Sequence, residues 1–361
     1  MADAVIVAAR RSAVAPRNGA FGRLQIHDLA APVIRDLLAS AGLGPDRVGE
    51  VILGNALGGG GNPARLAALA AGLPDRVGGL SIDRQCCGGM DAVMLADALI
   101  RAGLHEVVVA GGAESYSRRP LRLRTDPDGG PAIAYDQPPF TPWPDRDPDM
   151  AVAAQAIAEE LGIGRQAQDD WTCASHARAL AAQGRMRRQE ITVIGAVADD
   201  AFTRRLSART CSRAPVLAGS VTAANTAIAA DGAAFCLLVS DRIARRLAAP
   251  RWRIIAGASL GADPLLPGLA PVPAIRETLA AASLRPADLA AVDLMEAFAV
   301  QAIGCARLAD LPPDRINPGG GALARGHPIG ASGAINLVRL VHELGRAGER
   351  GLAAIAAAGG L

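Results

Sequence analysis

The sequence predicts an α/β fold made of two similar halves, and two observations support this prediction. Strand-like and helix-like segments alternate from the N-terminus, with apolar strands expected at 4–10, 50–57 and 106–112 and a helix at 26–43. This order is typical of a mostly parallel, buried sheet covered by helices. The second observation is an internal repeat. A chain of 361 residues, half of them hydrophobic, is long enough to bury two such units.

The repeat relates residues that lie 241 positions apart. Without a gap, "VIRDLLASAGLGPDRVGEVILGNA" aligns with "AIRETLAAASLRPADLAAVDLMEA", so that Ile34 meets Ile275 (275 − 34 = 241). The same offset places Cys86 on His327 (327 − 86 = 241). If the two copies pack about a pseudo-twofold axis, these side chains face one another at equivalent helix starts. The alternative is that any two βαβ segments align loosely.

The residues between the two copies differ in composition from both. They begin with the loop "TDPDGGPAIAYDQPPFTPWPDRDPD", rich in Pro, Gly and Asp, and continue into helices expected at 150–163 and 165–186. We therefore expect an insertion carried by the first half. The predicted division is a first half at 1–117 and 220–245, a loop domain at 118–219 and a second half at 246–361.

Charge and composition exclude several classes of function. The formal charge of +2 gives no electrostatic reason to expect nucleic acid or an anionic membrane as a partner. All 37 basic residues are arginines, which excludes a Schiff-base lysine and a phosphate-loop lysine. The six cysteines show no CxxC spacing, which argues against a zinc site and against a thioredoxin-like site. No apolar run reaches the roughly 18 residues of a membrane span, and the N-terminus lacks the order of a signal peptide. We expect a cytoplasmic protein.

Cys86 and Cys87 lie where "SIDRQCCGGMDAVMLADALI" turns helical. At a helix start, unpaired backbone N–H groups and the helix dipole favour a thiolate, by up to about 2 kcal/mol. Acyl transfer from a thioester needs a nucleophile, a proton acceptor and donors for the oxyanion, and His327 with nearby backbone N–H groups supplies the last two. The alternative is that both cysteines are small packed hydrophobes.

Several motifs in order resemble those of the thiolase superfamily. "IDRQCCGGMDAV" resembles the nucleophile segment, and "GNPARLAALAAGLP" and "VAGGAES" are similar to the segments on either side of it. The stretches "DMAVAAQAIAEELGI" and "QDDWTCASHARALAAQGRMRRQEI" resemble the loop-domain helices of the family. "GSVTAANTAIAADGAA", "MEAFA" and "NPGGGALARGHPIGASGA" match three later motifs. The resemblance implies a thiolase fold, with two pseudo-twofold-related βαβαβαββ halves in five layers and a loop domain over the site.

The resemblance also implies an activity and a site. The substrate would be a coenzyme A or carrier-protein thioester, with no permanently bound cofactor, and the protein would form a homodimer or a dimer of dimers. Cys86 would carry the acyl group, His327 would activate it, and Cys87 would only pack. The family's motifs place further residues at the oxyanion and pocket positions, namely Met150, Met295, Phe298, Ala356 and Ala358. Ala227 would lie along the pantetheine arm of coenzyme A. From their chemistry, Arg204, Arg205 and Arg209 would meet the phosphates of coenzyme A, because guanidinium groups suit phosphate, although a solvated loop is the alternative.

Four departures from the family pattern concern mainly the chemistry. Met295 stands where the family's NEAF motif has an asparagine that holds an oxyanion water, and a thioether cannot donate a hydrogen bond. Ala356 replaces the second cysteine, the acid/base for the carbon proton. Asp149 and Ala227 replace a histidine and a serine beside the pantetheine arm. The chain stops at Leu361 where the family continues into a last central strand, which implies an omitted tail or a strand supplied differently.

These departures leave three functions open. The first is a thiolase-like acyltransferase that passes the acyl group from Cys86 to an amine, an alcohol, an already acidic carbon or water. The second is an ordinary acetyl-CoA C-acetyltransferase of reduced activity. The third is a thiolase-like subunit without turnover that serves a partner protein. A dinucleotide-binding oxidoreductase is disfavoured because no GxGxxG follows the first strand.

Overall fold

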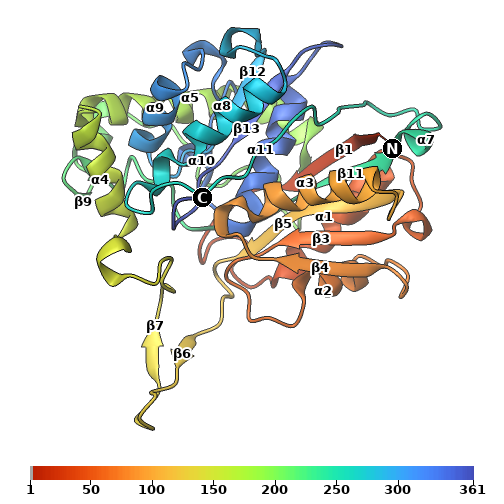
Figure 1. Cartoon of the computed structure of the whole chain (residues 1–361), viewed down its shortest axis with the longest axis horizontal. Coiled ribbons are helices and arrows are strands. Elements are labelled where there is room, and N and C mark those ends of the chain that lie inside the picture. The colour runs from red at the N-terminus through yellow and green to blue at the C-terminus, as the bar shows by residue number, and fades with distance from the viewer. Residues whose placement is uncertain (1–2) are drawn as a thin grey trace.

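The first half is built on a seven-stranded mixed sheet in the computed structural model, which describes residues 3–361. β11 lies at the centre of this sheet and pairs antiparallel with β5 on one side and β1 on the other (Figure 1). The order across the sheet is β4 (Gly78–Ile82), β3 (Glu50–Gly54), β5 (Val107–Ser115), β11 (Ala230–Ser240), β1 (Ala4–Ser12) and β8 (Ile191–Thr192), with β2 (Ala15–Pro16) paired to β11.

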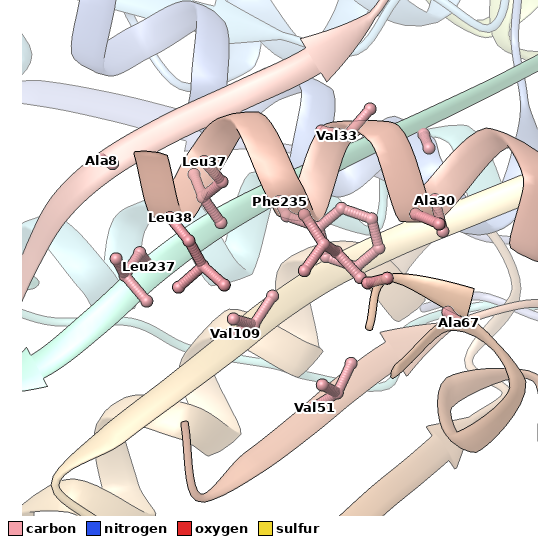
Figure 2. Close-up of a cluster of buried hydrophobic side chains, with 14 of the residues drawn as sticks. Ala8, Ala30, Val33, Leu37, Leu38, Val51, Ala67, Val109, Phe235 and Leu237 are labelled. Atoms are coloured by element: carbon pink, nitrogen blue, oxygen red, sulfur yellow. The ribbon is translucent and has the colours of Figure 1, made fainter. Parts of the chain in front are cut away.

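Helices cover both faces of this sheet. α1 (Ile26–Ser40) and α2 (Pro63–Ala70) lie on one face, where Leu29, Val33 and Leu37 recur at helical spacing and are fully buried. Figure 2 shows α1 packed over Phe235 of β11 and Val109 of β5. Each fully buried side chain of this kind contributes about 1.5–3 kcal/mol relative to its exposed state. This burial explains why the segment predicted at 26–43 forms a helix here.

The other face carries α3 (Gly88–Arg101) together with α11 (Ile329–Glu343) of the second half. Their backbones approach closely because glycines lie between them. A Cβ added to Gly89 would lie 2.8 Å from the Gly330 oxygen, and one added to Gly333 would lie 2.7 Å from the Met90 nitrogen. The glycines of "CCGGM" and "HPIGASG" therefore allow the two helices to pack against each other, with their N-terminal ends side by side.

The second half repeats the first, as the sequence predicts. α3 begins at residue 88 and α11 at residue 329, and β3 begins at residue 50 and β12 at residue 291 (329 − 88 = 291 − 50 = 241). The short turns Pro45–Arg47 and Pro286–Asp288 also correspond. The elements of the second half are α8 (Pro271–Ala281), β12 (Ala291–Leu294), α9 (Ala299–Leu308), α10 (Ala322–Arg325), α11 and β13 (Gly351–Ala354).

The sheet of the second half is smaller than that of the first. Among residues 3–361, only β12 and β13 form a ladder in this half, and residues 251–259, at its start, make one bridge through Trp252 to Ile6. In the first half, β11 fills the space between β5 and β1. The corresponding space between β13 and residues 251–259 is a groove of about 720 Å³ that α3, α8 and α11 also line. The βαβαβαββ pattern is therefore complete in the first half only, over the residues described.

The segment between β5 and β11 forms a hairpin and a layer of helices. The hairpin of β6 (Arg122–Arg124) and β7 (Ile133–Tyr135) projects away from the body (Figure 1). It is followed by α4 (Met150–Glu160) and α5 (Arg165–Gln189), close to both predicted helices. Shorter elements complete it, namely α6 (Ala208–Ser212), β9 (Val216–Ala218) and β10 (Val221–Thr222), and α7 (Asp241–Ala244) follows β11. None of the helices in residues 3–361 has the length and apolar character needed to span a bilayer.

Candidate active site

Cys86 lies in a single 3₁₀ turn, Gln85–Cys87, between β4 and α3. Gln85 has a φ of +49°, in the left-handed region that non-glycine residues adopt at a cost of about 1–3 kcal/mol. α3 itself begins at Gly88, so Cys86 precedes the helix instead of lying in its first turn as predicted. The sharp turn directs the Cys86 sulfur toward the second half of the molecule.

His327 approaches Cys86 from the loop between α10 and α11. Its backbone N–H donates to the Ile228 oxygen at 2.8 Å, which fixes the loop against the strand end of the first half. His327 Nε2 lies 3.1 Å from Cys86 Sγ. The pairing that the repeat predicts is therefore present, at hydrogen-bond distance for a thiol.

Ser332, one turn into α11, sets the tautomer of His327. Its hydroxyl donates to the Pro328 oxygen at 2.9 Å and lies 2.6 Å from His327 Nδ1. Because the single hydroxyl proton is used on Pro328, Nδ1 must carry the proton of the imidazole and donate it to Ser332. Nε2 is then free to accept a proton from Cys86. Sequence reasoning missed Ser332, although "GHPIGAS" places it four residues after Pro328, within reach of that carbonyl.

Both members of the pair are neutral at pH 7. Burial raises the pKa of the Cys86 thiol to about 12, with Glu114 adding to this effect and the Cys86 N–H opposing it. Burial lowers the pKa of His327 to about 4. Desolvation of the thiol therefore outweighs the stabilisation of a thiolate that we expect at a helix start. The geometry instead favours transfer of the thiol proton to Nε2 as the sulfur attacks.

Backbone N–H groups near the sulfur are available to an oxyanion. In residues 3–361, neither the Cys86 N–H nor the Ala358 N–H donates to another residue, although the Cys86 N–H faces its own sulfur, and both residues line the same cavity. Ala358 lies in the turn that follows β13 (Gly351–Ala354). Two such N–H groups are the kind of donors that stabilise a thioester oxyanion.

Cys86 and His327 both line a cavity of about 480 Å³. Of the predicted pocket residues, five line this cavity: Met150, Ala227, Phe298, Ala356 and Ala358. Met295 does not line it. Its side chain is 2% exposed and packs with Cys87 and Ile355 behind the wall. Cys87 is likewise buried in this apolar cluster, as the packing role predicts.

The arginines predicted for coenzyme A lie outside the residues that line the cavity. The Arg204 guanidinium lies 3.9 Å from the ring centre of Phe202, and its backbone N–H donates to His176 Nδ1 at 3.3 Å. Arg205 and Arg209 are exposed on the same segment. Their contact with coenzyme A stays a prediction.

Two buried carboxylates organise the walls. Glu114 accepts hydrogen bonds from the N–H groups of Ala56 and Gly330 and from the Asn55 amide, and burial raises its pKa to about 7. It thereby joins the end of β5 to the start of α11 beside His327, and sequence reasoning missed it because a lone "AES" has no distinctive spacing. Glu296 accepts from Trp171, Ser175 and Asn317 and does not line the cavity, so its contacts are structural.

No group of three or more His, Cys, Asp or Glu side chains in residues 3–361 is arranged to hold a metal ion.

Two family models together match nearly the whole chain. The thiolase N-terminal domain matches residues 4–242 and the thiolase C-terminal domain matches residues 248–361. A putative acetyl-CoA C-acetyltransferase of Bacillus subtilis is 41% identical over 371 residues, covering 99% of this chain and 97% of that protein. An acetyl-CoA acetyltransferase of Cupriavidus necator is 38% identical over 384 residues, covering 100% and 98%.

The fold agrees with a solved structure of similar sequence. The crystal structure of the Bacillus anthracis acetyl-CoA acetyltransferase matches with a TM-score of 0.92 and 34% sequence identity, over 100% of this chain and 97% of that chain. The predicted thiolase fold is therefore confirmed.

Proposed function

The chain belongs to the thiolase family and is an acyltransferase, and from this premise we propose that Cys86 takes the acyl group of a coenzyme A or carrier-protein thioester. The observation that supports this most is the 3.1 Å distance between Cys86 Sγ and His327 Nε2 in a cavity large enough for an acyl chain. The tautomer set by Ser332 leaves Nε2 ready to accept the thiol proton.

In the acylation step, the acyl group moves from the sulfur of coenzyme A to the sulfur of Cys86. Cys86 Sγ attacks the thioester carbonyl carbon while its proton moves to His327 Nε2, and the carbonyl oxygen becomes an oxyanion near the N–H groups of Cys86 and Ala358. The oxyanion then re-forms the carbonyl, the bond from carbon to the coenzyme A sulfur breaks, and that sulfur takes the proton from Nε2. The products are acyl-Cys86 and free coenzyme A.

We propose that the acceptor does not require a cysteine base at position 356. Ala356 lines the cavity without an ionisable group, and Met295 is buried behind the wall and offers no donor. General acid–base catalysis is typically worth about 10²- to 10⁴-fold. An amine, an alcohol, an acidic carbon or water as acceptor avoids this loss, because His327 alone can accept the proton of such a group.

The names of the relatives favour a second candidate, ordinary C-acetyl transfer. The Bacillus subtilis and Cupriavidus necator proteins are named as acetyl-CoA acetyltransferases. That reaction needs an enolate of the thioester. Exchange of the acetyl methyl protons of acetyl-CoA in deuterated water would support it, whereas acylation of Cys86 without exchange would favour the first candidate.

Intact-mass spectrometry tests the proposal against a subunit without turnover. After incubation with acetyl-CoA and longer acyl-CoA donors, the native chain should gain one acyl mass. Cys86→Ala should gain none, and Cys87→Ala, in the apolar cluster next door, is the matched control that should be acylated normally. If the native chain and Cys86→Ala show the same gain in mass with every donor, the acyl-enzyme is ruled out.

We also propose a homodimer that assembles in the cytoplasm. β4 ends the large sheet, its outer edge has no partner strand in residues 3–361, and Leu80 on this strand is 41% exposed. Such an edge readily pairs with a second copy. Light scattering on the purified protein would give the mass of a dimer or a dimer of dimers; a monomer at micromolar concentration would contradict it.

A further inference from the structure

Part of the cavity wall is charged and comes from the segment that follows β5. Tyr116, Arg119 and Arg122 contribute to it, together with Asp136 from the residue after β7. The hairpin of β6 and β7 projects from the body (Figure 1). Arg122 at its start and Asp136 just after it line the cavity that holds Cys86. Arg119 and Asp136 in this wall pair with each other, whereas Arg122 and the cavity carboxylate Asp83 form no ion pair in residues 3–361.

Arg119 is neutralised within the protein. Its guanidinium forms an ion pair with Asp136 and lies 4.8 Å from the ring centre of Tyr116. The Arg119 side chain is 15% exposed, whereas that of Asp136 is 79% exposed, so the pair lies where the cavity meets solvent. Arg119 therefore has little free charge to offer a ligand.

Arg122 is the cavity cation without an acidic partner. One guanidinium nitrogen donates to the Ala56 oxygen at 3.0 Å, and the Ala56 N–H is in turn held by Glu114. Within residues 3–361, no carboxylate oxygen lies within 4.0 Å of the Arg122 guanidinium. The other carboxylate in the wall, Asp83, accepts a hydrogen bond from the Gln85 N–H. A guanidinium has five N–H donors, so most of those on Arg122 remain available.

From these contacts we propose that Arg122 binds a carboxylate at the far end of the acyl group, which makes the preferred donors coenzyme A monothioesters of dicarboxylic acids. The proposal rests on the proposed function, because it names the acyl chain that Cys86 would carry. A guanidinium fork matches a carboxylate through two parallel hydrogen bonds. The anchor at Ala56 holds that fork in place, which lowers the entropy lost on binding. Apolar wall residues such as Leu57 and Ile329 are suited to the methylene groups between thioester and carboxylate.

A phosphate of coenzyme A is the competing ligand for Arg122, and the two ligands predict different results. If Arg122 binds the acyl carboxylate, its loss affects only donors that have one. If it binds a phosphate, its loss affects every coenzyme A ester equally and has no effect on acyl-pantetheine donors, which have no phosphate.

The test measures binding to Cys86→Ala, which cannot be acylated, by isothermal titration calorimetry. Glutaryl-CoA and pentanoyl-CoA form a pair of equal chain length, one ending in a carboxylate and the other in a methyl group. Glutaryl-CoA should bind about ten- to a hundredfold more tightly, as expected for hydrogen bonds to a charged group. In Cys86→Ala with Arg122→Gln, the ratio of the two dissociation constants should fall toward one. Arg118→Gln is the matched control, since Arg118 is exposed and does not line the cavity.

Pantetheine esters of the same two acids complete the test. The preference for the glutaryl ester should persist in them and should disappear with Arg122→Gln. Equal affinity for glutaryl and pentanoyl donors, or an equal loss for both with Arg122→Gln, would overturn the inference. Circular dichroism and thermal melting confirm that each variant is folded. Because binding to Cys86→Ala needs no chemistry, failure here is distinct from failure of native Cys86 to become acylated.

Discussion

Ser332 Oγ lies 2.6 Å from His327 Nδ1, on the side of the imidazole away from Cys86. This contact, together with the bond from Ser332 to the Pro328 oxygen, decides which nitrogen of the imidazole carries the proton. Ser332 does not touch the sulfur and acts as a positioning residue. We therefore expect the reactivity of Cys86 to depend on a side chain of the second half that does not line the cavity.

Ser332→Ala should slow acylation of Cys86 without preventing it. Loss of the hydrogen bond that fixes the tautomer is worth about 1–2 kcal/mol, or about five- to thirtyfold in rate. Single-turnover acylation followed by mass spectrometry gives the rate, and ¹⁵N NMR of labelled histidine reports the tautomer. Ser332→Thr keeps the hydroxyl and should recover most of the rate. A normal rate in Ser332→Ala, with an unchanged tautomer, would contradict the assigned role.

The acylation rate should be nearly constant between about pH 5 and pH 9. His327 must be neutral to accept the thiol proton, and burial lowers its pKa to about 4, so activity should fall only near that pH. Burial raises the pKa of Cys86 to about 12, so no thiolate forms in this range. Single-turnover rates and thiolate absorbance near 240 nm check both statements. Burial raises the pKa of Glu114 to about 7, so Glu114→Gln is measured in parallel. An inflection near the usual histidine pKa of about 6.5 that persists in this variant would show that the pair is solvated.

The lowered pKa of His327 also affects the stability of the folded protein. The unfolded chain binds a proton on this residue below its ordinary pKa of about 6.5, whereas the folded chain does so only near 4. The stability contributed by neutral His327 is therefore present above pH 6.5 and is lost as the pH falls through this window. Urea unfolding of the native protein and of His327→Phe at pH 4.5 and 7 should show a smaller loss for the variant. Equal losses would contradict the shift.

Gly89→Ala should force α3 and α11 apart. The added Cβ would lie 2.8 Å from the Gly330 oxygen and 2.9 Å from the Ala334 nitrogen, and both are backbone atoms that cannot move alone. Overpacking of this kind costs about 1–3 kcal/mol, and displacement of α11 should also lengthen the distance from Cys86 to His327. Denaturant unfolding and the acylation rate should both decline. The control is Gly184→Ala in α5, where the new Cβ has one ordinary contact, 3.6 Å from Arg188; there the change should be neutral or slightly stabilising.

Glu296→Ala should lower stability more than it lowers the rate of the chemical step. It leaves the donors of Trp171, Ser175 and Asn317 without their acceptor, and each buried unpaired donor costs about 1–3 kcal/mol. Urea unfolding should show a lower midpoint, whereas Glu277→Ala, on the exposed face of α8, should not. If folded Glu296→Ala loses acylation while its unfolding midpoint is unchanged, Glu296 has a catalytic role after all.

Amide hydrogen exchange should be faster in the sheet of the second half than in that of the first. β5 is paired on both sides, by β3 and β11. Within the described residues 3–361, β13 is paired by β12 alone and faces the groove beside residues 251–259. Amides on the groove side of β13 should therefore exchange faster than those of β5. Equal protection in the two strands would show that the groove edge is covered in solution.

The sequence alone determined the architecture and the reacting pair. Alternating apolar segments are local patterns, so they predicted the α/β halves and the helix positions. The gap-free repeat, which relates residues 241 positions apart, predicted that Cys86 meets His327. The glycines of both motifs were also visible, although their purpose, close approach of α3 and α11, became clear only from the packing.

The tertiary structure decided the protonation state, the partners and the lining of the cavity. Burial keeps Cys86 and His327 neutral, and no sequence pattern reports desolvation. Met295 is withdrawn behind the wall, while Arg122 reaches the cavity and bonds to Ala56 across 66 positions of sequence. These features depend on which distant segments share one space and exclude water from it, and that is fixed only when the whole chain has folded.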